Sequence, residues 1–347
     1  MAVPQQKQLD FIAYIQRLLI EGDFVATYKY ALLHAIADIC IEQPLNNNPR
    51  DEVVIPFTEI VEKFLTLYWQ HAVPFSKSEG HKAILLQNTG KQAKMITSLY
   101  ECQQKNIKNI NQLAKSEYWQ TIKRDTLRVL KEGPLWRLQI LAKQEECFLY
   151  AHVKDKSQQY ITLKPDIAFC FRRFYDLVVH LARSSWMQKI QNISHNQALL
   201  GSQSQLHEFL FGVNRQAITT AKPVLLEIQK GNCFYCQKPL KTNGKKEVEI
   251  DHFIPFVRYA NDLGHNFVAA HKSCNNAKRD HLAATPHKER WFEQNISEHS
   301  TLIENELSKY FNCDAQRSEA VTSWAYQIAA NNGAKLWVGG KEFVTIV

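Results

Sequence analysis

The feature that most constrains this chain is a pair of short knuckles, Cys233-x-x-Cys236 and His271-x-x-Cys274. Two such pairs, well separated along a chain, supply the four sulfur and nitrogen ligands of a closed tetrahedral zinc site. The sequence therefore predicts a structural Zn²⁺ that ties together the two ends of the segment 231–284. Alone, the first pair could equally be a redox pair or two buried thiols, and it is the second pair that favours zinc.

The segment between the knuckles has the pattern of two strands and a helix. Val248 and Ile250 alternate with acidic residues, which predicts a half-buried strand that ends at Asp251-His252. Neighbouring side chains on a strand point to opposite faces, so we expect Asp251 and His252 to diverge. A loop over 253–265 and a returning strand over 266–270 follow.

A helix is expected from about Ser273 to Ala284. In that helix Asn275, Lys278 and Arg279 would share one face, because residues three and four apart are neighbours on a helix surface.

These residues resemble the motif of the HNH endonuclease family, whose nuclease unit has a ββα-metal fold. The resemblance is carried by Asp251-His252-x-x-Pro255, Asn266 and His271-x-x-Cys274-Asn275-x-x-Lys278. It implies that His252 is the general base, that Asp251 and Asn275 hold one divalent cation, and that Asn266 fixes the loop. The sequence departs from the motif twice, with Asn275 where the family name has His and His271 where many members have Cys. An amide oxygen at position 275 favours Mg²⁺ or Mn²⁺ over a softer metal.

The chemistry of phosphodiester hydrolysis fits these residue types. The reaction needs a deprotonated water, neutralised charge on the phosphate and a stabilised leaving oxygen. A neutral histidine can take the proton of water, a carboxylate with an amide suits a hard cation, and Lys278 and Arg279 can bind phosphates. We therefore predict a divalent-metal-dependent HNH endonuclease, with a restriction or anti-phage defence role and DNA preferred over RNA through the family resemblance. The alternative is a zinc-stapled module that binds nucleic acid or protein without cleaving, since an Asp-His pair alone is more often structural than catalytic.

The net charge of the chain indicates the class of its partner, and its cysteines indicate the cellular compartment. The net charge is +8, and residues 230–290 hold eleven lysines and arginines against six carboxylates, which favours an acidic partner such as nucleic acid. Outside the knuckles the cysteines show no disulfide framework, so we expect a cytoplasmic protein; they are Cys40, Cys102, Cys147, Cys170 and Cys313. With no apolar leader and no run near about 18 apolar residues, no membrane partner is expected.

The whole chain is expected to be α+β and mostly helical. Length and periodicity predict a helical accessory domain over 1–200 that could bind a protein partner or effector, a nuclease domain over 205–290, and a helical extension over 291–347. Within these parts we expect two helices over 8–42 that break at Gly22, and helices over about 56–70 and 165–193. We also expect a small sheet within 135–163, a linker over 195–205 and a last strand within 337–347.

Overall fold

The computed structural model describes residues 3–44, 48, 50–75, 83–152, 155, 157–200, 205–212, 218–240 and 248–346. Its described part is mostly helical and holds small sheets of two strands each, so the predicted α+β class is confirmed. The chain divides into two compact units, 1–41 with 45–211 and 42–44 with 212–347. Each unit has a buried core of its own.

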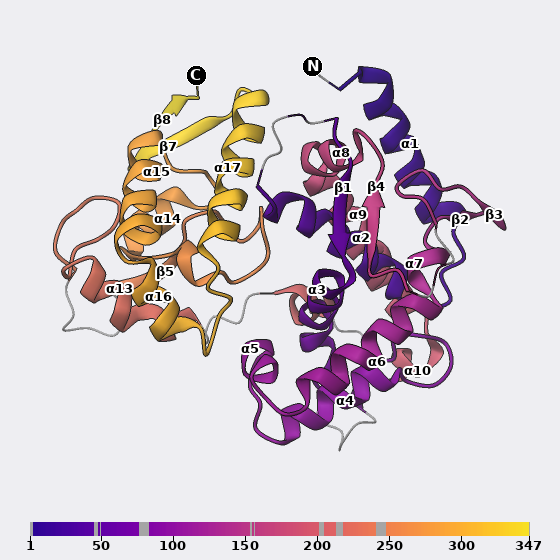
Figure 1. The fold of residues 1–347 in the computed structure, drawn as a ribbon. Helices are drawn as coiled ribbons and strands as arrows, with labels where there is room; N and C mark the ends of the chain where they lie inside the picture. The colour runs from indigo at the N-terminus through magenta and orange to yellow at the C-terminus, as the bar shows by residue number, and fades with distance from the viewer. Residues whose placement is uncertain are drawn as a thin grey trace. The chain divides into compact units, whose positions relative to one another are not determined.

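The first unit, indigo to magenta and rose in Figure 1, is built around helices with two short sheets. Its described helices are α1 (Gln5–Glu21), α2 (Tyr28–Glu42, whose last residue belongs to the second unit), α3 (Phe57–Trp69), η1 (Gln70–Ala72), α4 (Lys94–Gln104), α5 (Ile110–Ala114), α6 (Trp119–Glu132), α7 (Pro134–Arg137), α8 (Ile167–Arg173), α9 (Tyr175–Gln191), α10 (Ser194–Leu200) and α11 (Leu206–Phe211). Its strands are β1 (Val53–Pro56), β2 (Ile140–Leu141), β3 (Gln144–Glu145) and β4 (Tyr160–Leu163). Strand β1 pairs antiparallel with β4, and β2 with β3.

Helix α2 forms the centre of the first unit. Every residue from Tyr30 to Ile41 is buried, and a helix that is buried all round is a core element. Its buried His34 and Asp38 side chains are paired, because His34 lies 3.4 Å from Asp38, and the Tyr175 hydroxyl also donates to Asp38 at 2.7 Å. The predicted pair of helices that breaks at Gly22 is confirmed.

The sheet expected within 135–163 is only partly as predicted. Residues 135–137 belong to the helical turn α7 instead of a strand, because Pro134 fits the first turn of a helix. The hairpin of β2 and β3 lies within the predicted range. Strand β4, however, pairs with β1, which was not predicted and precedes α3 directly.

Two further expectations in this unit are corrected. The helix predicted over 165–193 is interrupted at Phe174, which has a non-helical ψ of 23° and separates α8 from α9. The predicted linker contains the helix α10 up to Leu200, and its residues 201–204 lie outside the described part of the chain.

The second unit, orange to yellow in Figure 1, contains the predicted two strands and helix. Its described elements are η3 (Thr219–Ala221), α13 (Lys222–Ile228), β5 (Val248–His252), η4 (Gly264–Asn266), β6 (Phe267–His271), α14 (Lys272–Lys278), α15 (Thr285–Trp291), the π-helix η5 (Phe292–Glu298), α16 (Ser300–Leu307), α17 (Ala315–Asn331), β7 (Lys335–Gly339) and β8 (Glu342–Thr345). Strands β5 and β6 are antiparallel, with Asp251 opposite Val268 and His252 opposite Phe267. Helix α14 ends at Lys278, which is six residues before the end that the sequence predicted.

The C-terminal elements pack onto the two strands and α14 and complete their core. The backbone of Trp337 in β7 accepts a bond from Ala284 at 2.7 Å and donates one to Leu282 at 2.8 Å. From η5, the buried amide of Asn295 donates to the carbonyls of His265 and Phe267 at 2.8 and 2.9 Å. Residues 291–347 therefore share the core of the unit that holds the motif.

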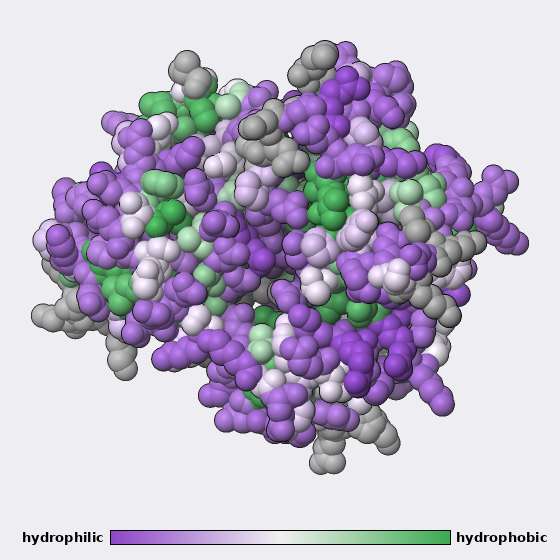
Figure 2. Space-filling view, viewed as in Figure 1, coloured by the Kyte–Doolittle hydropathy of each residue, from purple (hydrophilic) through white to green (hydrophobic). Residues whose placement is uncertain are grey.

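On the face drawn in Figure 2, hydrophilic side chains dominate and apolar ones form small separate patches. Within the described part of the chain, no helix combines the length and the apolar character needed to cross a membrane.

Candidate functional site

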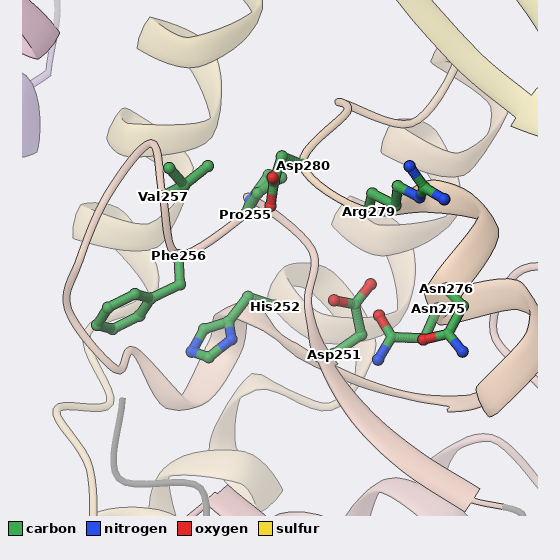
Figure 3. Close-up of a pocket in the computed structure, with 9 residues that line it drawn as sticks. All are labelled: Asp251, His252, Pro255, Phe256, Val257, Asn275, Asn276, Arg279 and Asp280. Carbon is green, nitrogen blue, oxygen red and sulfur yellow. The ribbon is translucent and has the colours of Figure 1, made fainter. Parts of the chain in front are cut away.

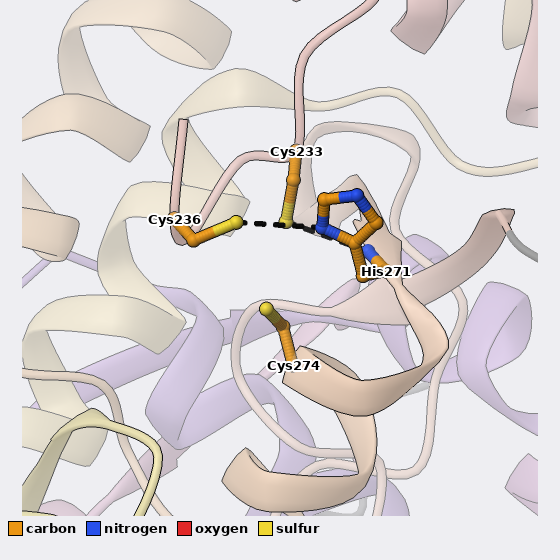
Figure 4. Close-up of side chains that lie close together, drawn as sticks. All are labelled: Cys233, Cys236, His271 and Cys274. Carbon is orange, nitrogen blue, oxygen red and sulfur yellow. Dashed lines mark hydrogen bonds between the residues drawn. The ribbon is translucent and has the colours of Figure 1, made fainter. Parts of the chain in front are cut away.

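The four knuckle residues converge in the second unit. The ligand atoms of Cys233, Cys236, His271 and Cys274 all lie within 4.8 Å of one another. The edge of a tetrahedral zinc site with sulfur ligands is about 4 Å, so this set fits a Zn²⁺ with small side-chain adjustments. Figure 4 shows the side chains approaching a common centre from the knuckle, the end of β6 and α14.

The histidine of this cluster is held in a tautomer that can bind zinc through one ring nitrogen. His271 Nδ1 lies 3.3 Å from the sulfur of Cys236, while Nε2 lies 3.1 Å from the carbonyl of Pro239. A carbonyl can only accept, so Nε2 carries the proton and Nδ1 is free to bind metal. Metal-binding histidines usually have such a second partner, which fixes the ring.

The backbone of the knuckle is held in place by its own turn and by Gln229. Gly231 has a φ of +72°, which a residue without a Cβ adopts at little cost, and its carbonyl accepts from Leu240 at 2.8 Å. The side chain of Gln229 both donates to and accepts from the backbone of Ala269 at 2.8 Å, which joins the knuckle to β6. These bonds hold the knuckle against β6, which carries the third ligand at its end.

A cleft of about 570 Å³ lies beside the end of β5. It is lined by Asp251, His252, Pro255, Phe256, Val257, Asn275, Asn276, Arg279 and Asp280. Figure 3 shows these side chains around the opening, with the Asp251 carboxylate beside the Asn275 amide. The predicted residues His252, Asp251, Asn275 and Arg279 thus meet in one cleft.

Asp251 is buried and bonded through one oxygen. Its Oδ2 accepts from the Tyr235 hydroxyl at 2.5 Å and lies 3.0 Å from Nζ of Lys278. Burial and then the charge of Asp251 raise the pKa of Tyr235 well above its ordinary value, so the hydroxyl keeps its proton and donates. Among the described residues nothing bonds to Oδ1, which leaves that oxygen available to a cation.

Asn275 is oriented by a carboxylate. Its amide nitrogen donates to Glu249 at 2.9 Å, and no described residue bonds to its amide oxygen. Glu249 and Asp251 lie two apart on β5 and therefore face the same side, where α14 supplies Asn275 and Lys278 as their partners. An available carboxylate oxygen and an available amide oxygen on the wall of one cleft fit a hard divalent cation.

His252 points to the other side of the strand, as expected. Its side chain is 8% exposed, and its ring packs edge-on against Phe267 with 5.1 Å between centroids. Its Nε2 lies 2.8 Å from a carboxylate oxygen of Asp262.

Asn266 lies outside the cleft and fixes the loop. It is 3% exposed, and its amide accepts from the nitrogen of Ile254 at 2.8 Å and donates to the carbonyl of Ile254 at 3.0 Å. These two bonds clamp the start of the loop that follows β5 to the start of β6.

Lys278 and Arg279 do not share an exposed face, and this expectation is wrong. The helix stops at Lys278, and Arg279 takes a φ of +50°, so the two side chains diverge. Lys278 is 0% exposed, and its ammonium donates to the carbonyl of His252 at 3.0 Å as well as pairing with Asp251. Arg279 is exposed on the cleft wall. Lys241, Lys245 and Lys246, which the sequence also favours as phosphate contacts, lie outside the described residues.

The sequence did not identify three residues that shape this site. Glu249 carried a usable signal, because it lies two residues before Asp251 on the same strand. Tyr235 lies between the first two cysteines, a position that the zinc pattern leaves unspecified. Asp262 is in an irregular loop ten residues after His252, and no local pattern points to it.

Comparison with known families agrees with this geometry. Residues 233–284 match the family model described as HNH endonuclease, and residues 6–210 match the model described as Domain of unknown function (DUF8808). No curated protein and no solved structure matched the chain. The HNH match covers the zinc cluster, both strands and α14, which confirms the resemblance. Since the other match spans more than half of the chain, the protein belongs to the DUF8808 family, and its second unit carries an HNH endonuclease domain.

Proposed function

We propose that this protein hydrolyses phosphodiester bonds of DNA with a divalent metal. The observation that carries the proposal is one cleft lined by His252, by Asp251 and Asn275 with their available oxygens, and by Arg279. The HNH match supports nucleic acid as the substrate class. The Cys₃His cluster supports a separate, structural Zn²⁺.

The residues divide the reaction between them. His252 takes the proton of a water, whose oxygen forms the new bond to phosphorus while the bond to the leaving oxygen breaks. The leaving oxygen then takes a proton from solvent. Arg279 holds a phosphate oxygen by charge-assisted hydrogen bonds. Asp251 and Asn275 would hold Mg²⁺ or Mn²⁺, which when bound supplies positive charge to the phosphate and the leaving oxygen.

We also propose a nucleic-acid preference, a biological role and a cellular location for the protein. The preference for DNA over RNA and a restriction or anti-phage defence role rest on the resemblance to HNH endonucleases. A cytoplasmic location accords with the five cysteines outside the cluster, which form no disulfide bonds in the structure. The DUF8808 unit would supply the contact with a protein partner or effector.

The test is cleavage of supercoiled plasmid and of a folded RNA by the purified full chain with Mg²⁺, with Mn²⁺ and with EDTA. We expect metal-dependent nicking or cutting of the plasmid, and a loss of about 10²–10⁴-fold or more in rate for His252→Ala with DNA binding retained. Cleavage of the RNA without cleavage of the plasmid would contradict DNA as the substrate. Wild-type cleavage by His252→Ala would overturn the site, and binding without cleavage in every metal would leave the protein as a zinc-stapled binding module.

A further inference from the structure

The predicted base is in contact with a carboxylate that the motif does not include. Asp262 Oδ1 lies 2.8 Å from Nε2 of His252, and the two side chains are 25% and 8% exposed. Two other carboxylates near the cleft are engaged differently, since Asp251 bonds to Tyr235 and Glu249 bonds to Asn275. Among the described residues, Asp262 is the carboxylate that lies within hydrogen-bond distance of the His252 ring.

The loop that carries Asp262 is fixed by backbone bonds on its C-terminal side. Leu263 forms a parallel bridge with Asn312, and Gly264 donates to the carbonyl of Asn312 at 2.8 Å. Gly264 is also tightly enclosed, because a Cβ at this position would lie 2.5 Å from the sulfur of Cys313. The position of Asp262 is therefore determined by the core of the second unit.

This contact decides which nitrogen of His252 carries the proton. An ionised carboxylate only accepts hydrogen bonds, so Nε2 must be protonated when it meets Asp262. The lone pair of the neutral ring is then on Nδ1, to which no described residue bonds. Phe256 and Phe267 pack against the ring with centroids at 5.4 and 5.1 Å and prevent it from turning freely.

We propose that Asp262 is the positioning residue of the catalytic base, which holds His252 with Nε2 protonated and turns Nδ1 towards the attacking water. The inference rests on the proposed function, because it assigns the geometry of the same base. As the proton moves to Nδ1, the ring becomes positive, and the adjacent carboxylate stabilises that charge. Asp262 itself touches neither the substrate nor the metal.

One arm of the test is kinetic and uses the full chain. We expect Asp262→Ala to lower the single-turnover rate of DNA cleavage by about 10- to 100-fold with DNA affinity unchanged, as for other partners that orient a functional histidine. Asp262→Asn should recover part of the rate, because its amide oxygen can accept the same bond. The matched control is Glu306→Ala, which removes an equal charge from an exposed position on α16 and should cleave as the wild type does.

The second arm does not depend on activity. In protein labelled with ¹⁵N-histidine and free of added metal, His252 should give a slowly exchanging imidazole N–H signal, assigned by its loss in His252→Ala. That signal should disappear in Asp262→Ala and persist in Glu306→Ala. Wild-type cleavage by Asp262→Ala, or an unchanged N–H signal in that variant, would overturn the inference. Such a result leaves the proposed function standing if His252→Ala is still inactive, whereas active His252→Ala removes the function itself.

Discussion

Lys278 shows how a charged side chain of the motif can belong to the core. Its ammonium lies between the carboxylate of Asp251 and the carbonyl of His252 and has no access to water. A buried ion pair offsets its desolvation only when both charges are present with good geometry. The role that fits Lys278 is therefore to hold Asp251 in place, and not to bind phosphate.

We predict that Lys278→Met destabilises the second unit by about 3–5 kcal/mol, because it leaves the buried charge of Asp251 without its partner. Urea unfolding followed by tryptophan fluorescence measures the change. Lys272→Met is the matched control on the same helix, since Lys272 is exposed and its loss should cost no more than about 0.5 kcal/mol. Equal stabilities for the two variants would contradict the pairing role of Lys278.

Arg279 is the motif cation that is exposed on the cleft wall. We predict that Arg279→Ala flattens the slope of log affinity against log salt by about one unit, because one phosphate contact releases about one counterion. Arg279→Lys keeps the charge and should keep the slope. Fluorescence anisotropy on a duplex of arbitrary sequence, titrated at several salt concentrations, makes the comparison. An unchanged slope in Arg279→Ala would remove the arginine from the interface.

At the scale of the elements, the position of the loop between β5 and β6 depends on the close approach of Gly264 to Cys313. Gly264 lies against Cys313, Leu307 and Ile303, of which only the cysteine sulfur is closer to a built Cβ than ordinary contact allows. The glycine is therefore required by space and not by its backbone angle. Its neighbour Asp262 orients His252, and its neighbour Asn266 fixes the loop. A displacement of the backbone at Gly264 would therefore also displace the predicted catalytic base.

We predict that Gly264→Ala costs about 1–3 kcal/mol of stability through overpacking and also slows cleavage. Cys313→Ala removes the clashing sulfur, so the double variant should be more stable than Gly264→Ala alone. Thermal unfolding of the four proteins forms a double-mutant cycle. Additive losses in the double variant would show that the two positions do not meet.

At the scale of the whole molecule, we expect zinc binding to stabilise the second unit and to leave the stability of the first unit unchanged. The cluster joins the knuckle after α13 to the end of β6 and to α14, all within residues 212–347. Structural zinc binding adds its free energy to the folding of the segment that it closes. The first unit draws its core from α2 and its neighbours, and its cysteines lie outside the cluster.

We predict one tightly held zinc per chain by elemental analysis and the loss of that zinc in Cys274→Ser. Hydrogen exchange should then rise across 218–240 and 248–284 and stay unchanged in α2 and α3. Cys40→Ser, which alters a buried thiol of the first unit, should keep its zinc. A wild type that contains no metal and shows the same protection would contradict the structural role.

The sequence by itself determined the local chemistry of the site. The spacing of Cys233, Cys236, His271 and Cys274 specified a cluster of four metal ligands, and alternation along 248–251 specified a strand that ends at Asp251-His252. These features depend on neighbours a few residues apart, so periodicity and ligand spacing reveal them. The HNH resemblance followed from the same residues.

Only the tertiary structure decided what lies against those residues. Lys278 is buried because β5 presents Asp251 to it, and Asp262 reaches His252 because residues 312–313 hold its loop. Likewise, β4 pairs with β1, more than a hundred residues earlier in the chain. These contacts join segments that are distant in sequence, and burial and pairing between such segments depend on the packing of the whole unit, which no local pattern contains.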